Sequence, residues 1–153
     1  MNAARRSALL LILISGSLLA GALWFQYGVG LPPCEMCFWQ RYAHLGVLTV
    51  AGFAAAFGRT LVVWLAVLAM LVAASLGLFH AGVEQGWWQG VTACTSAMQP
   101  GMTQADIFAT IMNSPLVRCD QIPWQFLGLS MAAWNALISA VAASAAAVIL
   151  WRR

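Results

Sequence analysis

Four long apolar stretches divide the chain, and the polar residues gather between them. The stretches cover residues 8–25, 38–57, 61–79 and 126–151. An α-helix needs roughly 20 apolar residues to cross a bilayer, so each stretch is about long enough. Unpaired backbone polar groups are costly in lipid, and these segments are therefore expected to be helical. The pattern predicts an all-α membrane protein: a four-transmembrane-helix bundle that forms a single integral membrane domain over residues 1–153.

The composition supports a membrane protein. Hydrophobic residues make up 63% of the chain and charged residues only 7%, whereas about a quarter of the residues in a soluble domain are charged. The first span follows Arg5 and Arg6 and could be mistaken for a signal peptide. Its apolar run is longer than the core of a usual signal peptide, so we expect it to remain as a span.

The arginines predict the orientation, because the chain contains no lysine. With both termini in the cytoplasm, five of the seven arginines lie inside, as the positive-inside rule expects: Arg5, Arg6, Arg59, Arg152 and Arg153. The loops at residues 26–37 and 81–125 then lie on the outer side of the membrane. The net charge of +3 is accounted for by this topology and suggests no nucleic-acid partner.

The second loop contains a segment with the pattern of a short helix, TQADIFATIM at residues 103–112. Thr103 can cap it, and Asp106 three residues later completes a capping pattern. Ile107, Phe108 and Met112 contribute to one apolar stripe. Such a helix is expected to lie flat on the outer membrane interface. The alternative is a helix packed on the end of the bundle.

All four cysteines fall on the outer side: Cys34, Cys37, Cys94 and Cys119. Two pairs on an oxidising face point to disulfide chemistry. Structural disulfides suit the pair Cys94 and Cys119, which would close a long loop, better than the small ring of a CxxC. A zinc site with four cysteine ligands is a second alternative, although the later pair lacks the close spacing of usual zinc modules. Redox exchange is the third.

Redox exchange explains the surroundings of the first pair best. Cys37 lies at the N-terminal end of the second span, where the helix dipole favours a thiolate. Arg41 follows one turn later and can stand on the same face, although its side chain could instead extend to the outer headgroups. His80, at the outer end of the third span, is as compatible with a structural role as with a functional one. No haem or nucleotide motif is present, so by elimination the electron acceptor is expected to be a membrane quinone.

Three segments resemble the bacterial disulfide bond formation protein B (DsbB) family: PCEMCFWQR at 33–41, HAGVEQGWW at 80–88 and CDQIPWQFLGLSM at 119–131. The four spans, the early CxxC and the two cysteines of the second loop match as well. The resemblance implies a quinone-dependent protein thiol oxidase in the bacterial inner membrane. It would reoxidise a periplasmic thioredoxin-fold carrier resembling DsbA and pass the electrons to ubiquinone or menaquinone.

The same resemblance implies a role for each site residue. Cys37 would face the quinone, with Cys34 as its disulfide partner, and Arg41 would support quinone reactivity. Cys94 would be attacked by the reduced carrier. Cys119 would pair with Cys94 at rest and exchange with Cys34. His80 would lie near the quinone.

Two other functions would also place cysteines in the loops of a small helical bundle. In enzymes of the vitamin K epoxide reductase type the CxxC follows the loop pair, whereas here it precedes it. A non-enzymatic four-span scaffold with structural disulfides would show no response to quinone.

Overall fold

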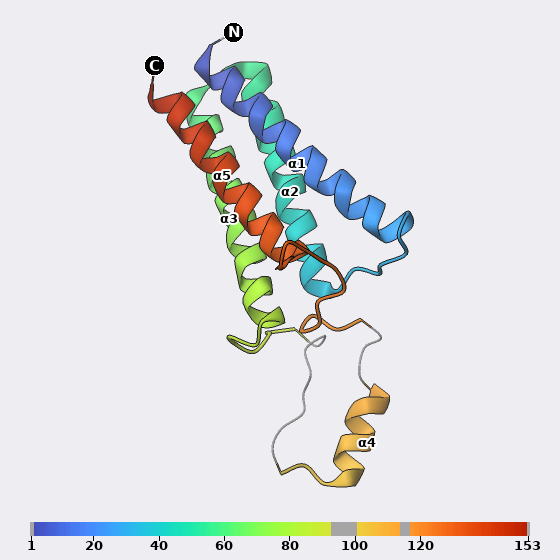
Figure 1. Ribbon diagram of the computed structural model, residues 1–153. Helices are drawn as coiled ribbons and strands as arrows, with labels where there is room; N and C mark the ends of the chain where they lie inside the picture. The colour runs from blue at the N-terminus through green and yellow to red at the C-terminus, as the bar shows by residue number, and fades with distance from the viewer. Residues whose placement is uncertain (1, 93–100, 114–116, 153) are drawn as a thin grey trace.

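Four long helices lie side by side as a bundle in the part of the chain that the computed structural model describes, residues 2–92, 101–113 and 117–152 (Figure 1). They are α1 (Ala3–Tyr27), α2 (Glu35–Phe57), α3 (Thr60–Glu84) and α5 (Met131–Trp151). Between α3 and α5 come a short helix, α4 (Gln104–Asn113), and the antiparallel strands β1 (Gln125–Phe126) and β2 (Leu129–Ser130).

The four long helices close a ring in which α1 packs on α2, α2 on α3, α3 on α5 and α5 on α1. The most extensive contact joins α3 and α5. Gly77 of α3 makes this approach possible, because a Cβ there would lie 2.9 Å from the backbone nitrogen of Ala136. Small residues at helix contacts let backbones approach closely in lipid, which is the packing expected of the Ala- and Ser-rich α5. The N- and C-terminal ends lie at the same end of the bundle (Figure 1).

Local signals set the ends of these helices. The side chains of Asn2, Cys34 and Ser130 each accept a hydrogen bond from the backbone N–H three residues later, which caps α1, α2 and α5. Gly58 ends α2 in the left-handed region at φ 64°, and α3 begins at Thr60. The connection between α2 and α3 is therefore very short.

Among the described residues, α1, α3 and α5 are long and apolar enough to cross a membrane, which confirms three of the predicted spans. Helix α2 has sufficient length, with 23 residues, but does not reach the same hydropathy. The reason is visible in its first half, which contains Gln40, Arg41 and His44.

The predicted start of the last span, at residue 126, is wrong. Residues 125–130 form a β-hairpin, with Gln125 opposite Ser130 and Phe126 opposite Leu129. The turn residues Leu127 and Gly128 both have positive φ, at 51° and 79°, as in the two-residue turns that suit a hairpin. The apolar run FLGL was mistaken for helix, and α5 begins only at Met131.

The predicted end of the third span, at residue 79, is also wrong, since α3 continues to Glu84. The second loop was expected to begin at residue 81, but the helix extends through Glu84, and both His80 and Glu84 find partners inside the bundle.

The short helix predicted at residues 103–112 is confirmed as α4. Its predicted cap is present: Asp106 N donates to Thr103 Oγ1 at 3.3 Å, and Thr103 N donates to Asp106 Oδ2 at 3.2 Å. Figure 1 shows α4 beyond the end of the bundle, away from the termini. Its location at a membrane interface stays a prediction.

Candidate functional site

The CxxC pair forms the start of α2. Cys34 is the N-cap residue, and its Sγ accepts a hydrogen bond from the backbone N–H of Cys37 at 3.3 Å. Both cysteines are free thiols, and their sulfur atoms lie 2.8 Å apart. A two-residue spacing on the first helical turn thus brings the two sulfurs together at a terminus that favours negative charge.

The end of α3 lies beside the thiol pair. His80 Nε2 lies 3.6 Å from Cys34 Sγ and 3.8 Å from the Glu84 carboxylate one turn further on. His80 is buried, with 3% of the residue's surface exposed. Glu84 in turn accepts a hydrogen bond from Ser130 at the start of α5. Helices α2, α3 and α5 therefore meet around the thiol pair.

Cys119 belongs to the same cluster. It is completely buried and packs with Cys34, Met36 and Val83, although it is distant from them in sequence. Cys119 is disulfide-bonded, and Cys94 lies outside the described residues. A zinc site with four cysteine ligands is not compatible with this arrangement, because a disulfide sulfur cannot serve as a thiolate ligand.

The charges beside Cys119 neutralise each other. Arg118 donates from Nε and Nη2 to the two carboxylate oxygens of Asp120, at 2.9 and 2.6 Å. The two residues of this ion pair are the sequence neighbours of Cys119 on either side. Their opposite charges therefore leave no strong net charge beside its sulfur.

Cys34 and Cys37 differ in acidity. The hydrogen bond with Cys37, followed by burial, raises the pKa of the Cys34 thiol, while the backbone N–H groups at the start of α2 act in the opposite direction. Cys34 therefore retains the proton that the two sulfurs share. This leaves Cys37 as the sulfur able to act as a nucleophile.

A metal ion could in principle be held by Cys34, Cys37 and His80, whose ligand atoms all lie within 4.8 Å of one another. Two thiolates bound to one tetrahedral zinc ion are about 3.8 Å apart, given a Zn–S distance of about 2.3 Å. The observed separation of 2.8 Å is too short for two sulfur ligands of one zinc ion.

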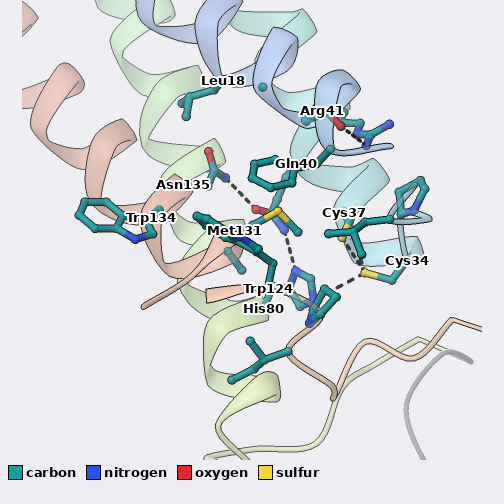
Figure 2. Close-up of a pocket in the computed structure, with 18 of the residues that line it drawn as sticks. Leu18, Cys34, Cys37, Gln40, Arg41, His80, Trp124, Met131, Trp134 and Asn135 are labelled. Carbon is teal, nitrogen blue, oxygen red and sulfur yellow. Dashed lines mark hydrogen bonds between the residues drawn. The ribbon is translucent and has the colours of Figure 1, made fainter. Parts of the chain in front are cut away.

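The thiol pair opens into a cavity of about 660 Å³ (Figure 2), within the range of pockets that bind small organic molecules. Its walls are mainly apolar and aromatic, contributed by α1, the α1–α2 connection, the hairpin with the residue before it, and α5: Leu18, Phe25, Leu31, Trp124, Phe126 and Trp134. Most of its polar side chains come from the start and first half of α2, from α3 and from α5: Cys34, Cys37, Gln40, Arg41, His44, His80, Glu84 and Asn135. Ser17, Arg118 and Gln121 also line it. A flat apolar ligand with a few hydrogen-bond acceptors fits this lining.

Arg41 lines the same cavity, one turn beyond Cys37. Its guanidinium is held in place by Gln26 Oε1 and by the backbone oxygen of Ala22, the latter at 3.1 Å. It also lies 5.4 Å from the centre of the Phe38 ring. The predicted site residues Cys34, Cys37, Arg41, His80 and Cys119 are thus near one another, and of the predicted set only Cys94 lies outside the described residues.

Sequence reasoning missed three polar residues of the site, Gln40, His44 and Asn135. They are linked to one another and to His80 by hydrogen bonds of 2.8 Å. A signal was available, because polar side chains within an apolar span are costly and usually functional. Their mutual contacts could not be predicted, since Asn135 is 91 residues from His44.

Comparison with known proteins gives a consistent result. Residues 4–149 match the family model described as "Disulfide bond formation protein DsbB". The disulfide bond formation protein B of Acidovorax sp. (strain JS42) is 36% identical over 149 residues, covering 88% of this chain and 80% of that protein. The proteins of the same name from Histophilus somni and Pasteurella multocida are 35% and 33% identical, covering 89% and 90% of this chain and 80% of each relative.

Proposed function

Because this chain belongs to the DsbB family of membrane disulfide bond formation proteins, we propose that it is a quinone-dependent protein thiol oxidase. It would reoxidise a periplasmic, thioredoxin-fold dithiol carrier resembling DsbA. The observation that carries the proposal is the pair of free, adjacent thiols of Cys34 and Cys37 at the wall of a large, mainly apolar cavity.

The exchange steps conserve thiols and disulfides. The carrier's two thiols reduce the disulfide of the second loop, assigned to Cys94 and Cys119, and the carrier leaves as a disulfide. The loop dithiol then reduces the Cys34–Cys37 disulfide, through attack by Cys119 on Cys34. The packing of buried Cys119 against Cys34 supports this second step. Free thiols at Cys34 and Cys37 together with a disulfide at Cys119 match the state that follows it.

The cavity residues suit a quinone by their chemistry. A bound quinone supplies an acceptor for two electrons and two protons, which is what closing a disulfide from two thiols releases. Arg41 can donate to a carbonyl oxygen and stabilise negative charge there. The aromatic side chains of Trp124 and Trp134 offer flat surfaces against which a ring can pack. The Cys34 thiol keeps its proton, so that Cys37 is the reactive sulfur.

We further propose that α2 crosses the membrane as the fourth span of a single domain and that both termini face the cytoplasm of a bacterial inner membrane. The termini lie at one end of the bundle and the start of α2, which carries the thiol pair, lies at the other, which supports this orientation (Figure 1). A reporter that is active only in the cytoplasm and one that is active only in the periplasm are each fused after Phe57 and at the C-terminus. At both positions only the cytoplasmic reporter should be active. Activity of either as a periplasmic reporter contradicts the topology.

The test of the function is quinone reduction by the purified full-length chain in detergent, with a reduced thioredoxin-fold dithiol as donor. Short-chain ubiquinone and menaquinone analogues are compared, which also identifies the acceptor. Cys37→Ser should lose turnover, whereas Ser75→Ala should retain it, because Ser75 is exposed and bonds only its own helix at Leu71. If folded wild type with reducible cysteines reduces neither quinone, the scaffold alternative is favoured.

A further inference from the structure

A continuous chain of polar side chains leads from the thiol pair into the apolar interior of the bundle. His80 Nε2 lies 3.6 Å from Cys34 Sγ, and His80 Nδ1 lies 2.8 Å from Gln40 Nε2. Gln40 Oε1 and Asn135 Nδ2 are 2.8 Å apart. Asn135 Oδ1 lies 2.8 Å from His44 Nε2, and His44 Nδ1 lies 2.9 Å from Ser15 Oγ. Figure 2 shows its outer part, from Cys34 through His80 and Gln40 to Asn135.

The backbone oxygen of Met36 determines the direction of this chain. Gln40 Nε2 lies 3.3 Å from it, and a carbonyl oxygen can only accept a hydrogen bond. The Gln40 amide must therefore present its nitrogen to Met36 and, with its second hydrogen, to His80. Reversing the amide would place two oxygen atoms against each other in a buried site, since Gln40 is only 8% exposed.

This orientation fixes the protonation of His80. Because Gln40 donates to Nδ1, that nitrogen must carry a lone pair, and the single hydrogen of the neutral ring is on Nε2. Nε2 is the atom that faces Cys34 Sγ and the Glu84 carboxylate. The His80 ring also makes a hydrogen bond with the backbone of Cys119, which belongs to the same cluster. A hydrogen on Nδ1 would point at the N–H of Gln40. The Gln40 amide thus aims the His80 N–H at the redox pair.

The same argument continues inward. Gln40 Oε1 accepts from Asn135 Nδ2, which leaves Asn135 Oδ1 to accept from His44 Nε2–H. His44 Nδ1 then accepts from the hydroxyl of Ser15, which is completely buried. Each donor in this chain faces an acceptor nearer to Cys34. The Ser15 hydroxyl also lies 3.6 Å from Met70 Sδ, but the ring nitrogen of His44 at 2.9 Å is the closer and stronger acceptor for its one hydrogen.

We propose that Ser15, His44, Asn135 and Gln40, here called the relay, are positioning residues for His80. They hold it as a neutral imidazole whose Nε2–H donates to Cys34 Sγ, and they thereby favour the reduced form of the Cys34–Cys37 pair. A thiol or thiolate accepts such a hydrogen bond better than a disulfide sulfur does. The inference rests on the proposed function only in treating this pair as redox-active.

The experiment uses nitrogen-15 NMR of full-length, reduced protein labelled at histidine. The chain has only two histidines, His44 and His80, and the imidazole shifts distinguish hydrogen on Nδ1 from hydrogen on Nε2. In wild type, both rings should carry hydrogen on Nε2. Asn135→Leu should produce a mixture of tautomers at His80, although Asn135 does not touch it, because Gln40 loses the shorter of its two orienting contacts and keeps only the 3.3 Å contact with the Met36 oxygen. The matched control is Ser144→Ala, since Ser144 is exposed on the same helix and bonds only Ala140.

A second variant, Gln40→Glu, should move the His80 hydrogen to the other ring nitrogen. It also provides a test if Asn135→Leu does not fold. In Gln40→Glu the side chain, as a carboxylate, can only accept, so a hydrogen should appear on Nδ1 of His80. His80 spectra that remain as in wild type in the folded variants would overturn the proposal, and they would do so whether or not the protein reduces quinone.

The redox consequence is measured separately, by equilibrating the Cys34–Cys37 pair with a dithiol buffer. Loss of one hydrogen bond to the reduced sulfur should shift the equilibrium on the order of fivefold toward the disulfide in Asn135→Leu. Ser144→Ala should match wild type. A changed His80 tautomer with an unchanged redox equilibrium would also overturn the proposal, because the relay would then not act on the pair.

Discussion

The two ends of the bundle differ in what their helices bury. Near the termini and the α2–α3 turn, the core consists of small and aliphatic side chains: Ala4, Ala8, Leu11, Val47, Ala51, Ala54, Val63, Ala66, Ala143, Ala146 and Leu150. At the other end the same helices enclose cysteines, polar groups and a cavity. The first end buries mainly apolar side chains, with the Ser7 hydroxyl donating to the backbone oxygen of Ala146. The second end encloses polar side chains and a cavity.

This difference implies a division of roles between the ends. Apolar helices in lipid associate mainly through close van der Waals contact, so the packed end is expected to hold the bundle together. The polar end, with its cavity, should contribute less to stability and more to activity. Substitutions at each end test this division, when the free energy of unfolding and the turnover are measured for the same variant.

The largest effect is expected at the packed end, for Leu11→Ala. Leu11 is completely buried, and its truncation should reduce the free energy of unfolding by about 3 kcal/mol. Denaturant unfolding in detergent measures the loss, while turnover per folded molecule should remain at the wild-type level. Leu13→Ala on the same helix is the control, since Leu13 is 66% exposed. An equal loss in both variants would contradict the division of roles.

Gly77→Ala should cost somewhat less, about 2 kcal/mol, by forcing α3 and α5 apart. Unlike Leu11→Ala it should also lower turnover, because the added Cβ would lie 3.0 Å from Asn135 Nδ2 in the relay. Thermal unfolding and quinone reduction are measured in parallel. Gly46→Ala is the matched control, since a Cβ at Gly46 meets nothing within 4 Å. Normal turnover in destabilised Gly77→Ala would show that this contact belongs to the packed end.

Arg41→Ala should change activity with little change in stability. Loss of the guanidinium should raise the KM for quinone about tenfold, the equivalent of one charge-assisted hydrogen bond. Exchange with the dithiol carrier should be unaffected. Arg41→Lys should be intermediate, because an ammonium keeps the charge but cannot reach Gln26 and the Ala22 oxygen in the same two-point manner. An unchanged KM in Arg41→Ala would mean that the arginine only anchors α2 to α1.

The smallest effect concerns α4, which lies outside both ends. Hydrogen bonds from Thr103 lower the pKa of Asp106 below its ordinary value of 3.8. Because the pKa is lowered in the folded state, the ionised Asp106 cap stabilises α4 fully at pH values above the ordinary pKa of 3.8. This stabilisation is lost as the pH falls through the lower pKa of the folded state. Hydrogen exchange of α4 amides, corrected for intrinsic rates, should lose protection below about pH 3.8. The change should be absent in Thr103→Ala, and the bundle amides should not follow it.

The fold was predictable where hydrophobicity alone decides it. Runs of apolar residues were enough for α1, α3 and α5, and Thr103 with Asp106 was enough for α4. The same criterion failed at Phe126–Ser130, because an apolar run does not distinguish a short hairpin from a helix. Two successive residues with positive φ break the helix there, and Leu127 gives no sequence signal of it.

The site was predictable only in part. The CxxC motif and the helix start indicated Cys34, Cys37 and Arg41 directly, and the family resemblance supplied Cys119. The relay was not predictable, since its hydrogen bonds join helices far apart in sequence. One sequence shows that Gln40, His44 and Asn135 are costly in an apolar span, but not that they compensate for one another.

The very short turn at Gly58 has a mechanical consequence. Helices α2 and α3 are connected by this turn at one end, while Cys34 and His80 lie toward their opposite tips, about 36 Å and about 30 Å away at 1.5 Å rise per residue. A change of one degree in the angle between the helices moves these tips by about 0.6 Å relative to each other. The distance between Cys34 Sγ and the His80 ring therefore depends on the angle between α2 and α3. Where a change in bilayer thickness is accommodated by a change in the angle between α2 and α3, it would alter the contact between Cys34 and His80.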